Sequence, residues 1–339
     1  MFAFTLLMVS LVTGASGFLG GHVLERLCKM NEDVRVLARK TSDFSELQHL
    51  HFEKYHGNLL DLESIIEAAR GVDTIFHCAG AVKYNSPYRD LYKVNVEGTR
   101  NVTIAASKAD VKRIVYASSL AVTGPEGQIN QDALKKIRPS MRENYCRSKA
   151  EAETIFFKEC QELGVEGIAL RPGVIYGPRD YTAAYHWFKA IDEGPAMLVG
   201  SGKTRFPLIF IEDLVDAFIA ASTLEMVTQS AYNINGAEEA SLKLIYDLIS
   251  RELGKEVEYH HYGYALSMTV AKMTQIKAAI MRKDIETIVS PFVIKLFGKD
   301  YPLINFQKAK EELGFEPKTT LEEGIKKTAK WYIERVREN

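Results

Sequence analysis

Short apolar runs alternate with longer amphipathic stretches through the first two thirds of the chain. The apolar runs predict six buried strands: one that ends at Val12, and those over 34–38, 50–55, 74–77, 113–117 and 165–170. The stretches between them with helical spacing are 18–30, 88–107 and 143–163. In the second of these, the side chains expected to face a core are Val94, Val102, Ile104 and Ala105. Strands that alternate with helices are typical of βαβ units, so we predict an α/β fold with a doubly wound parallel sheet.

The pattern changes from about Tyr176 onward, where the alternation gives way to irregular segments and helices. The helices that the spacing predicts there are 262–282, 291–297, 307–313 and 321–336. The sequence contains no internal repeat and no long linker, so we expect a small, mostly helical cap that packs directly on the sheet. Doubly wound folds bind ligands at the carboxyl ends of their strands, which makes the cleft between sheet and cap the expected site.

The composition is that of an ordinary folded protein of 339 residues. Hydrophobic residues make up 46% and charged residues 26%, which excludes a disordered or collagenous chain. Lysine and arginine number 43 against 44 aspartate and glutamate, so no overall positive charge favours nucleic acid. The four cysteines lack the C-x-x-C spacing of metal sites, and we expect reduced thiols and no metal. The expected partner is a small molecule, and the expected location is cytoplasmic.

The apolar start of the chain, 2–12, resembles a signal peptide only superficially. It lacks a basic segment before the apolar run and a convincing small-residue cleavage site. It leads directly into Thr13-Gly14-Ala15, which indicates a buried strand that enters a tight turn. No other apolar run reaches the roughly 18 residues that a membrane-spanning helix needs, so no integral membrane segment is expected.

A glycine-rich loop follows the first strand and opens the first helix: Thr13-Gly14-Ala15-Ser16-Gly17-Phe18-Leu19-Gly20. Glycine permits the sharp turn, the close approach of backbone to a pyrophosphate, and tight packing of helix on strand. The helix N-terminus then offers unpaired N–H groups to the phosphates. We therefore predict an NAD(P)-binding Rossmann region over 1–175, and over 176–339 a mixed region that returns to the sheet and forms the cap. The alternative is a structural glycine turn without a ligand.

Two cations occupy the position that distinguishes NAD from NADP. At the end of the second strand, NAD-binding chains place an acidic residue that accepts from the ribose 2′-hydroxyl. This chain has Arg39 and Lys40 there. Arginine can bind a 2′-phosphate through two hydrogen bonds and can stack on adenine. We predict that NADP(H) is preferred and NAD(H) is the second choice; a solvated basic loop is the alternative interpretation.

Tyr145 and Lys149 are four residues apart in a segment with helical spacing, so both project from one face. A tyrosine hydroxyl titrates near pH 10, and a neighbouring ammonium is expected to lower its pKa. The tyrosine can then serve as a general acid and base at neutral pH. The pair follows Ser118-Ser119, which comes at the end of a predicted core strand.

Several motifs together resemble the extended short-chain dehydrogenases/reductases, of the NAD-dependent epimerase/dehydratase type. The resemblance covers nearly the whole chain, and its motifs are specific for the superfamily but much less so for the substrate. Besides the glycine loop and the Tyr145/Lys149 pair, the motifs are His77-Cys78-Ala79-Gly80, Asn95-Val96-Glu97-Gly98-Thr99, Tyr116-Ala117-Ser118-Ser119, Arg171-Pro172-Gly173-Val174-Ile175-Tyr176-Gly177-Pro178 and Lys308-Ala309-Lys310-Glu311-Glu312-Leu313-Gly314.

The resemblance implies a role for each matching residue. Tyr145 is implied to be the general acid and base, Lys149 to hold the nicotinamide ribose and lower the tyrosine pKa, and Ser119 to hydrogen-bond the reacting oxygen. Asn58-Leu59 replaces the family's Asp-Leu beside adenine, where an asparagine can still accept from an amino group. The implied cofactor-binding residues are Gly14, Ser16, Gly17, Phe18, Leu19, Arg39, Asn58, Leu59, Cys78, Ala79, Gly80, Asn95, Tyr145, Lys149, Pro172 and Val174. Asp61 is expected to be a helix N-cap.

Two departures from the nucleotide-sugar members of the family bear on the substrate. Those members commonly carry Asn where this chain has Val174, so a sugar diphosphate would lose a polar partner. Their arginine before the Val-Asp-Asp segment is matched by Arg205 only with a one-residue shift, which is ambiguous. The cap segment 262–297 is rich in Met, aromatic and aliphatic residues and resembles the 3β-hydroxysteroid dehydrogenase-like and dihydroflavonol reductase-like branch.

We therefore expect an NAD(P)-dependent oxidoreductase that transfers a hydride between nicotinamide and a secondary alcohol or ketone. The expected substrate is mainly apolar, of a steroid, lipid or flavonoid type. The second hypothesis is a nucleotide-sugar epimerase or dehydratase that uses the same Ser119, Tyr145 and Lys149. A third is a catalytically idle dinucleotide sensor, and the intact catalytic residues argue against it.

The apolar cap helices have more than one interpretation. Met-rich helices adapt to apolar ligands, but they can equally form only the cap's own core. A weak peripheral membrane contact is the remaining interpretation, with a polar side formed by Lys272, Lys277, Arg282 and Lys283. The resemblance further implies a homodimer through a four-helix face made from the 88–107 and 143–163 helices.

Overall fold

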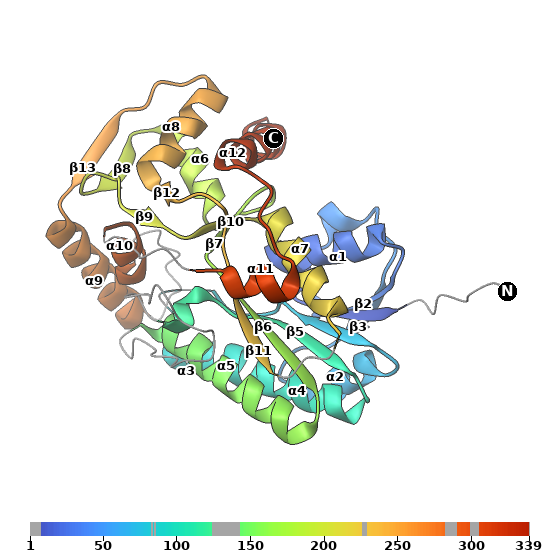
Figure 1. The fold of residues 1–339 in the computed structure, drawn as a ribbon. Helices are drawn as coiled ribbons and strands as arrows, with labels where there is room; N and C mark the ends of the chain where they lie inside the picture. The colour runs from blue at the N-terminus through green and yellow to red at the C-terminus, as the bar shows by residue number, and fades with distance from the viewer. Residues whose placement is uncertain are drawn as a thin grey trace.

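The computed structural model describes residues 8–82, 84, 86–123, 143–225, 229–281, 290–298 and 305–338, with backbone alone for 278–281. At its centre is a parallel sheet of seven strands in the order β11-β6-β5-β4-β1-β2-β3 (Figure 1). The strands are β1 (Val9–Thr13), β2 (Asp33–Ala38), β3 (Glu53–His56), β4 (Thr74–His77), β5 (Arg113–Ala117), β6 (Glu166–Pro172) and β11 (Ser230–Ile234). The predicted doubly wound fold with a helical cap is confirmed.

Helices cover both faces of this sheet. The elements that cover one face are α1 (Phe18–Lys29) and α7 (Ile211–Thr223), and those that cover the other are α2 (Leu62–Ala69), α4 (Gly98–Lys108) and α5 (Asn144–Leu163). Neighbouring residues of β1 show the two cores: Val12 packs on the α1 side and Leu11 on the α2 side, and both are fully buried. A strand buried on both faces has no polar alternation, which explains the continuous apolar runs in the sequence.

The predicted strands agree with the structure to within two residues except at one place. The interpretation of the apolar start as a strand is confirmed for β1, and residues 1–7 lie outside the described part. The strand predicted over 50–55 was placed too early, because β3 begins at Glu53. Leu50 and Phe52 precede it and pack on the α1-side core from a loop. Their apolar character indicated burial correctly but did not indicate a strand.

The helix predicted over 88–107 is interrupted by a π-helical segment. α3 (Tyr88–Leu91) continues into the π segment Tyr92–Glu97 and then into α4. Such segments shift the side chains that follow and are frequent at functional sites. The four side chains expected in the core divide accordingly: Val102 and Ala105 are buried, Ile104 is half-buried, and Val94 lines the cavity described below.

The cap combines helices with three short strand pairs. Its helices are α6 (Ala184–Glu193), α8 (Leu242–Leu253), α9 (Tyr264–Met281), α10 (Pro291–Gly298) and α12 (Leu321–Tyr332), and α11 (Gln307–Leu313) lies against β11. The strand pairs are β7 (Val174–Tyr176) with β10 (Leu208–Phe210), β8 (Ala196–Val199) with β13 (Tyr259–Tyr262), and β9 (Arg205–Phe206) with β12 (Ala240–Ser241).

The sequence pattern predicted α9 to α12 but missed α6, α7, α8, β11 and the strand pairs. Eight of the 13 residues of α7 are buried, so this helix presents little of the polar face that makes a 3.6-residue period visible. The paired strands have two to four residues each, too few for a period of two to stand out.

Candidate active site

A cavity of about 1100 Å³ opens at the carboxyl ends of the central strands, between the sheet and the cap. Residues that follow β1, β2, β4, β5 and β6 line it from the sheet side, and Phe292 and Leu296 of α10 line it from the cap side. Every residue that the sequence assigned to catalysis or cofactor binding lies in this lining, except Asn95. Residues more than 100 positions apart in the chain therefore meet where the doubly wound fold predicts a ligand.

The glycine loop has the shape that a pyrophosphate needs. Gly14 has φ +74°, and a Cβ there would lie 2.7 Å from the backbone of Ala79. A Cβ on Gly20 would be closer still to the Gly14 carbonyl, so the helix can pack against the loop only without a side chain. α1 begins after Gly17 with no side-chain cap and no acidic residue in its first turn. Its N-terminal N–H groups thus remain available to phosphate oxygens, and the loop fits a dinucleotide.

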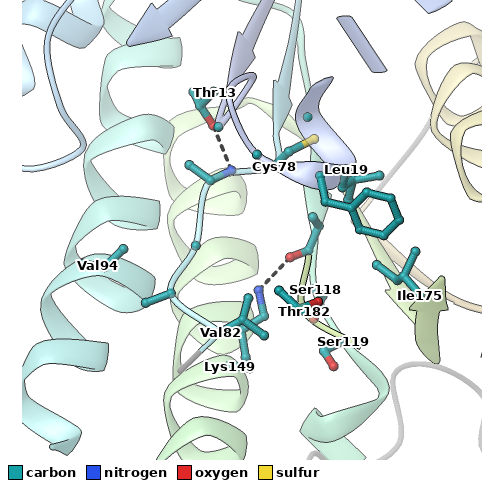
Figure 2. Close-up of a pocket in the computed structure, with 18 of the residues that line it drawn as sticks. Thr13, Leu19, Cys78, Val82, Val94, Ser118, Ser119, Lys149, Ile175 and Thr182 are labelled. Carbon is teal, nitrogen blue, oxygen red and sulfur yellow. Dashed lines mark hydrogen bonds between the residues drawn. The ribbon is translucent and has the colours of Figure 1, made fainter. Parts of the chain in front are cut away.

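Buried hydrogen bonds hold the second cofactor-side turn, Cys78 to Ala81, against the glycine loop. Thr13 Oγ1 accepts from the Ala79 N–H at 3.3 Å and bonds His77 Nδ1 at 2.8 Å (Figure 2). The other ring nitrogen of His77 lies 3.1 Å from Thr99 Oγ1 on α4. Burial and the nearby Lys149 ammonium lower the pKa of His77 to about 3. His77 is therefore a neutral cross-link between β1, β4 and α4, behind the cavity rather than in its lining.

Asn95 was assigned to cofactor binding, but the structure places it behind the same turn. It belongs to the π segment before α4 and is buried. Its Oδ1 accepts from the Ala81 N–H at 2.7 Å, and its Nδ2 donates to the Ala81 carbonyl at 3.1 Å and to Ser148 Oγ at 3.0 Å. Because all its polar atoms are used in this way, Asn95 positions the turn against α5 and does not line the cavity.

The far end of the cavity, where an adenosine would lie, has two cations and no carboxylate. Arg39 and Lys40 are exposed and line it directly after β2, and among the described lining residues there is no Asp or Glu. Asn58 also lines it, and its Oδ1 accepts from the Leu60 N–H at 2.9 Å, which fixes the turn. The predicted N-cap is confirmed, because the Asp61 carboxylate accepts from the Ser64 N–H.

The three catalytic candidates come from two neighbouring elements. Ser119 follows β5, and Tyr145 and Lys149 lie on the first turns of α5, which packs beside that strand. Lys149 Nζ donates to the Ala117 carbonyl at 2.7 Å (Figure 2) and to Tyr116 Oη at 3.3 Å. The Ser119 hydroxyl lies near Tyr145, and its Oγ accepts from the Ala121 N–H at 3.1 Å. The structure thus gathers a hydroxyl pair and a buried ammonium on one wall of the cavity.

The pKa of Tyr145 differs from the expectation: it is raised, not lowered. Burial raises the pKa of Tyr145 to about 12, and the neighbouring Ser119 hydroxyl lowers this pKa in part. The Lys149 ammonium was expected to lower the tyrosine pKa, but in this structure its hydrogen bonds go to Ala117 and Tyr116 instead. Burial lowers the pKa of Lys149 to about 8, against the attraction of Glu153. Tyr145 is accordingly protonated at neutral pH and poised to donate.

Two aromatic side chains that the sequence did not single out complete the site. The Tyr84 ring meets Tyr145 edge-on at 5.2 Å between centroids and stacks on Phe292 at 4.8 Å. Both rings line the cavity, Tyr84 from the loop after β4 and Phe292 from α10. The apolar composition of 291–297 was a signal for Phe292, whereas no motif marked Tyr84.

The described residues that line the cap side of the cavity are mainly apolar. Its lining includes Val82, Pro207 and Leu296 beside the two rings. Among the described lining residues, the only charged ones are Arg39, Lys40 and Lys149. Arg205, the ambiguous position in the sequence, is exposed on β9, does not line the cavity, and forms an ion pair with Glu239, which directly precedes β12.

Within the described residues, no helix is both long and apolar enough to cross a bilayer. That part of the chain also contains no group of three His, Cys, Asp or Glu side chains that could hold a metal ion. The four cysteines are all described and form no disulfide.

Known proteins share both the sequence and the fold of this chain. Residues 10–235 match the NAD dependent epimerase/dehydratase family. The chain is 27% identical to a 3-beta-hydroxysteroid dehydrogenase of Mycolicibacterium neoaurum, over 96% of this chain and 91% of that protein. It is 25% identical to the decarboxylating sterol-4-alpha-carboxylate 3-dehydrogenase of Mus musculus, over 94% and 89% respectively.

Solved structures show the same fold at lower identity. The UDP-glucuronic acid 4-epimerase of Bacillus cereus, in complex with UDP-glucuronic acid and NAD, superposes with a TM-score of 0.77 at 19% identity. The match covers 96% of this chain and 99% of that structure. The family match extends over more than half of the chain and includes the glycine loop and the Ser119, Tyr145 and Lys149 wall. The chain therefore belongs to the NAD dependent epimerase/dehydratase family, the extended short-chain dehydrogenases/reductases, and is an NAD(P)-dependent oxidoreductase of that family.

Proposed function

We propose that the protein interconverts a secondary alcohol and a ketone on a mainly apolar substrate, with NADP(H) as the preferred cofactor. The substrate class is inferred from the apolar lining on the cap side of the cavity. There Tyr84, Phe292 and Leu296 face the wall that carries Ser119, Tyr145 and Lys149, which we call the catalytic wall. An apolar ring or chain placed there gains by leaving water, whereas a diphosphate would lose its water without meeting a cation among the described residues of the cap side.

Each catalytic residue has a task in this reaction. A bound nicotinamide supplies or accepts the hydride. Tyr145, protonated at neutral pH, donates its hydroxyl proton to the carbonyl oxygen during reduction and takes it back during oxidation. Ser119 donates a hydrogen bond toward the same oxygen as negative charge develops there. Lys149, buried beside Ala117, holds a ribose hydroxyl of the bound cofactor.

The relatives support the same substrate class by their names. Two of them are sterol or steroid 3-dehydrogenases that align along almost the entire chain. The structural neighbour that binds a nucleotide sugar shares the fold at 19% identity, and a shared fold alone does not indicate the substrate of this chain. A nucleotide-sugar epimerase or dehydratase with the same catalytic wall is the alternative function.

The two functions are separated by a thermal-shift titration of the NADP-loaded protein with UDP and dTDP. A ligand that binds only the folded state must raise its melting temperature. We expect NADP itself to raise the melting temperature and neither nucleotide to raise it further, because the described residues of the apolar cap side include no cation for their phosphates. A saturable rise with either nucleotide would assign the protein to nucleotide-sugar chemistry.

The NADP preference is tested at Arg39. We expect Arg39→Asp to lower kcat/KM with NADPH by about ten- to hundredfold and to change it little with NADH, because only a 2′-phosphate loses a charge-assisted hydrogen bond. Arg39→Lys keeps the charge without the planar fork and should give an intermediate loss. Initial rates with both reduced cofactors measure the ratio. An unchanged ratio in Arg39→Asp would mean that the exposed side chain is only solvated.

Two further expectations stay predictions from the sequence. The homodimer would use the outer faces of α4 and α5, which lie side by side on one face of the sheet (Figure 1). Sedimentation at micromolar concentration measures it directly. The cytoplasmic location likewise stays a prediction.

A further inference from the structure

Helix α9 carries a stripe of large apolar side chains on the side that faces solvent. Leu266, Val270, Met273 and Ile276 follow helical spacing and are 46–65% exposed. The opposite side of the helix, with Ala271 fully buried, packs against α10. We call the four exposed side chains the outer face of α9. Single exposed apolar residues are ordinary, but four on one helix mark an interaction surface.

The charges that α9 itself carries are of one sign; Arg282 and Lys283, which follow it, lie outside the described residues. Exposed Lys272 and Lys277 are on the same solvent side, with Lys277 one turn after Met273 along the stripe. None of the 18 residues of α9 is an aspartate or glutamate. Lysine can lay its aliphatic stem along an apolar surface and extend its ammonium to a more polar layer. An apolar stripe with lysines and no carboxylate matches the interface of an anionic bilayer, where acyl chains lie below phosphate groups.

This surface is directly linked to the candidate substrate side. α9 lies at the outer edge of the cap, with α10 on its inner side (Figure 1). α10 in turn supplies Phe292 and Leu296 to the cavity lining. Only one helix therefore separates the outer face of α9 from the cavity in which the proposed apolar substrate reacts.

We propose that the outer face of α9 docks the protein on the surface of an anionic phospholipid membrane and brings the cap next to its apolar substrates. The second clause rests on the proposed function; the docking itself rests on the surface alone. A second copy of the chain fits this face less well, because an α9-to-α9 contact would bring lysines together without a carboxylate on either helix.

The docking is measured by flotation of the full-length protein with two kinds of vesicle: phosphatidylcholine alone, and phosphatidylcholine with about one quarter phosphatidylglycerol. We expect binding to the anionic vesicles and markedly weaker binding to the neutral ones. The double variant Met273→Glu with Ile276→Glu should lower the partition coefficient about tenfold or more, since both carboxylates would have to enter the interface. The pair Lys272→Gln with Lys277→Gln should remove most of the preference for anionic vesicles.

The matched control introduces two glutamates at exposed apolar positions away from α9: Met30→Glu at the C-cap of α1, with Leu244→Glu on α8. It should float like the wild type, and all variants should keep the wild-type circular dichroism spectrum and thermal midpoint. Wild type that floats with neither vesicle, or control and α9 variants that lose binding equally, would overturn the proposal. Self-association abolished by the α9 variant, without vesicle binding, would assign the face to a second copy instead.

Turnover of a water-soluble ketone without vesicles keeps this result separate from the proposed function. The α9 double variant should reduce such a ketone at the wild-type rate, because its substitutions lie outside the cavity. If the wild type binds vesicles but reduces no ketone, the membrane surface stands and the proposed reaction fails. If it reduces ketones but ignores vesicles, the reverse holds.

Discussion

Replacing Tyr145 by phenylalanine is expected to lower kcat for ketone reduction by about two to four orders of magnitude, with little change in stability or in cofactor affinity. The ring is buried in the cavity wall and contacts Tyr84 and Phe292, and phenylalanine keeps those contacts. What disappears is the hydroxyl that is proposed to carry the proton. The measurement is nicotinamide absorbance in initial-rate assays, with cofactor affinity from a separate titration.

The pH dependence of the wild type provides a second signature of the same hydroxyl. Burial raises the pKa of Tyr145 to about 12, so the protonated form dominates throughout the neutral range. Reduction needs that form, and its rate should be nearly flat from pH 6 to pH 9 as far as this group is concerned. Oxidation needs the phenolate, whose fraction grows about tenfold per pH unit below the pKa, so its rate should climb with pH. Tyr145→Phe should remove the climb.

Tyr84→Phe is the matched control for this experiment. It removes a hydroxyl from the neighbouring ring, preserves the stacking on Phe292, and leaves the hydroxyls of Ser119 and Tyr145 in place. We expect its kcat to stay within about threefold of the wild type, because no proton transfer is assigned to it. If Tyr145→Phe turned over at the wild-type rate, or Tyr84→Phe lost as much activity as Tyr145→Phe, the acid and base would have been assigned to the wrong residue.

The parts of the site that could be predicted are those whose residue types are dictated by local backbone geometry. Gly14 has a positive φ and a neighbour 2.7 Å from where a Cβ would be, so a glycine is required and visible in sequence. Tyr145 and Lys149 are one helical turn apart, so their spacing alone places them on one face. Ser119 directly follows a strand of the doubly wound sheet.

The parts that could not be predicted depend on contacts between distant segments. Tyr84 and Phe292 are 208 positions apart in the printed sequence and stack only because α10 folds back over the loop after β4. Asn95 was assigned to the cofactor from its motif, yet the π segment turns its amide toward Ala81. The direction of the Tyr145 pKa was also wrong, because burial outweighs a charge whose hydrogen bonds lead elsewhere.

A buried ion pair connects the elements that carry the site, and breaking it should have the largest effect on stability. Glu153, fully buried on α5 one turn after Lys149, accepts from Arg171 Nε at 2.9 Å on β6. It also accepts from Ser118 Oγ at the end of β5. The next residues along these two strands are Ser119 and Pro172, both in the cavity lining. One carboxylate therefore fixes α5, β5 and β6 relative to each other.

Glu153→Ala is expected to lower the free energy of unfolding by about 3–5 kcal/mol, because it leaves the Arg171 guanidinium buried without its counter-charge. Urea unfolding at neutral pH measures the loss. Glu162→Ala on the same helix removes the partner of Lys158 in an exposed pair and should cost at most about 1 kcal/mol. The comparison separates the effect of burial from that of losing a helical glutamate.

The double variant Glu153→Leu with Arg171→Met shows whether the lost stability of Glu153→Ala comes from an isolated buried charge or from lost hydrogen bonds. If the cost of Glu153→Ala comes from an isolated buried charge, removing both charges and refilling the volume should recover most of the stability. If it comes from the hydrogen bonds that the carboxylate makes, the double variant should stay as unstable as the single one. In either case Ser118 loses its acceptor, so we expect the recovered protein to have a lower kcat than the wild type, since the segment that carries Ser119 is no longer fixed to α5. Full recovery of both stability and kcat would show that the ion pair has no part in positioning the catalytic wall.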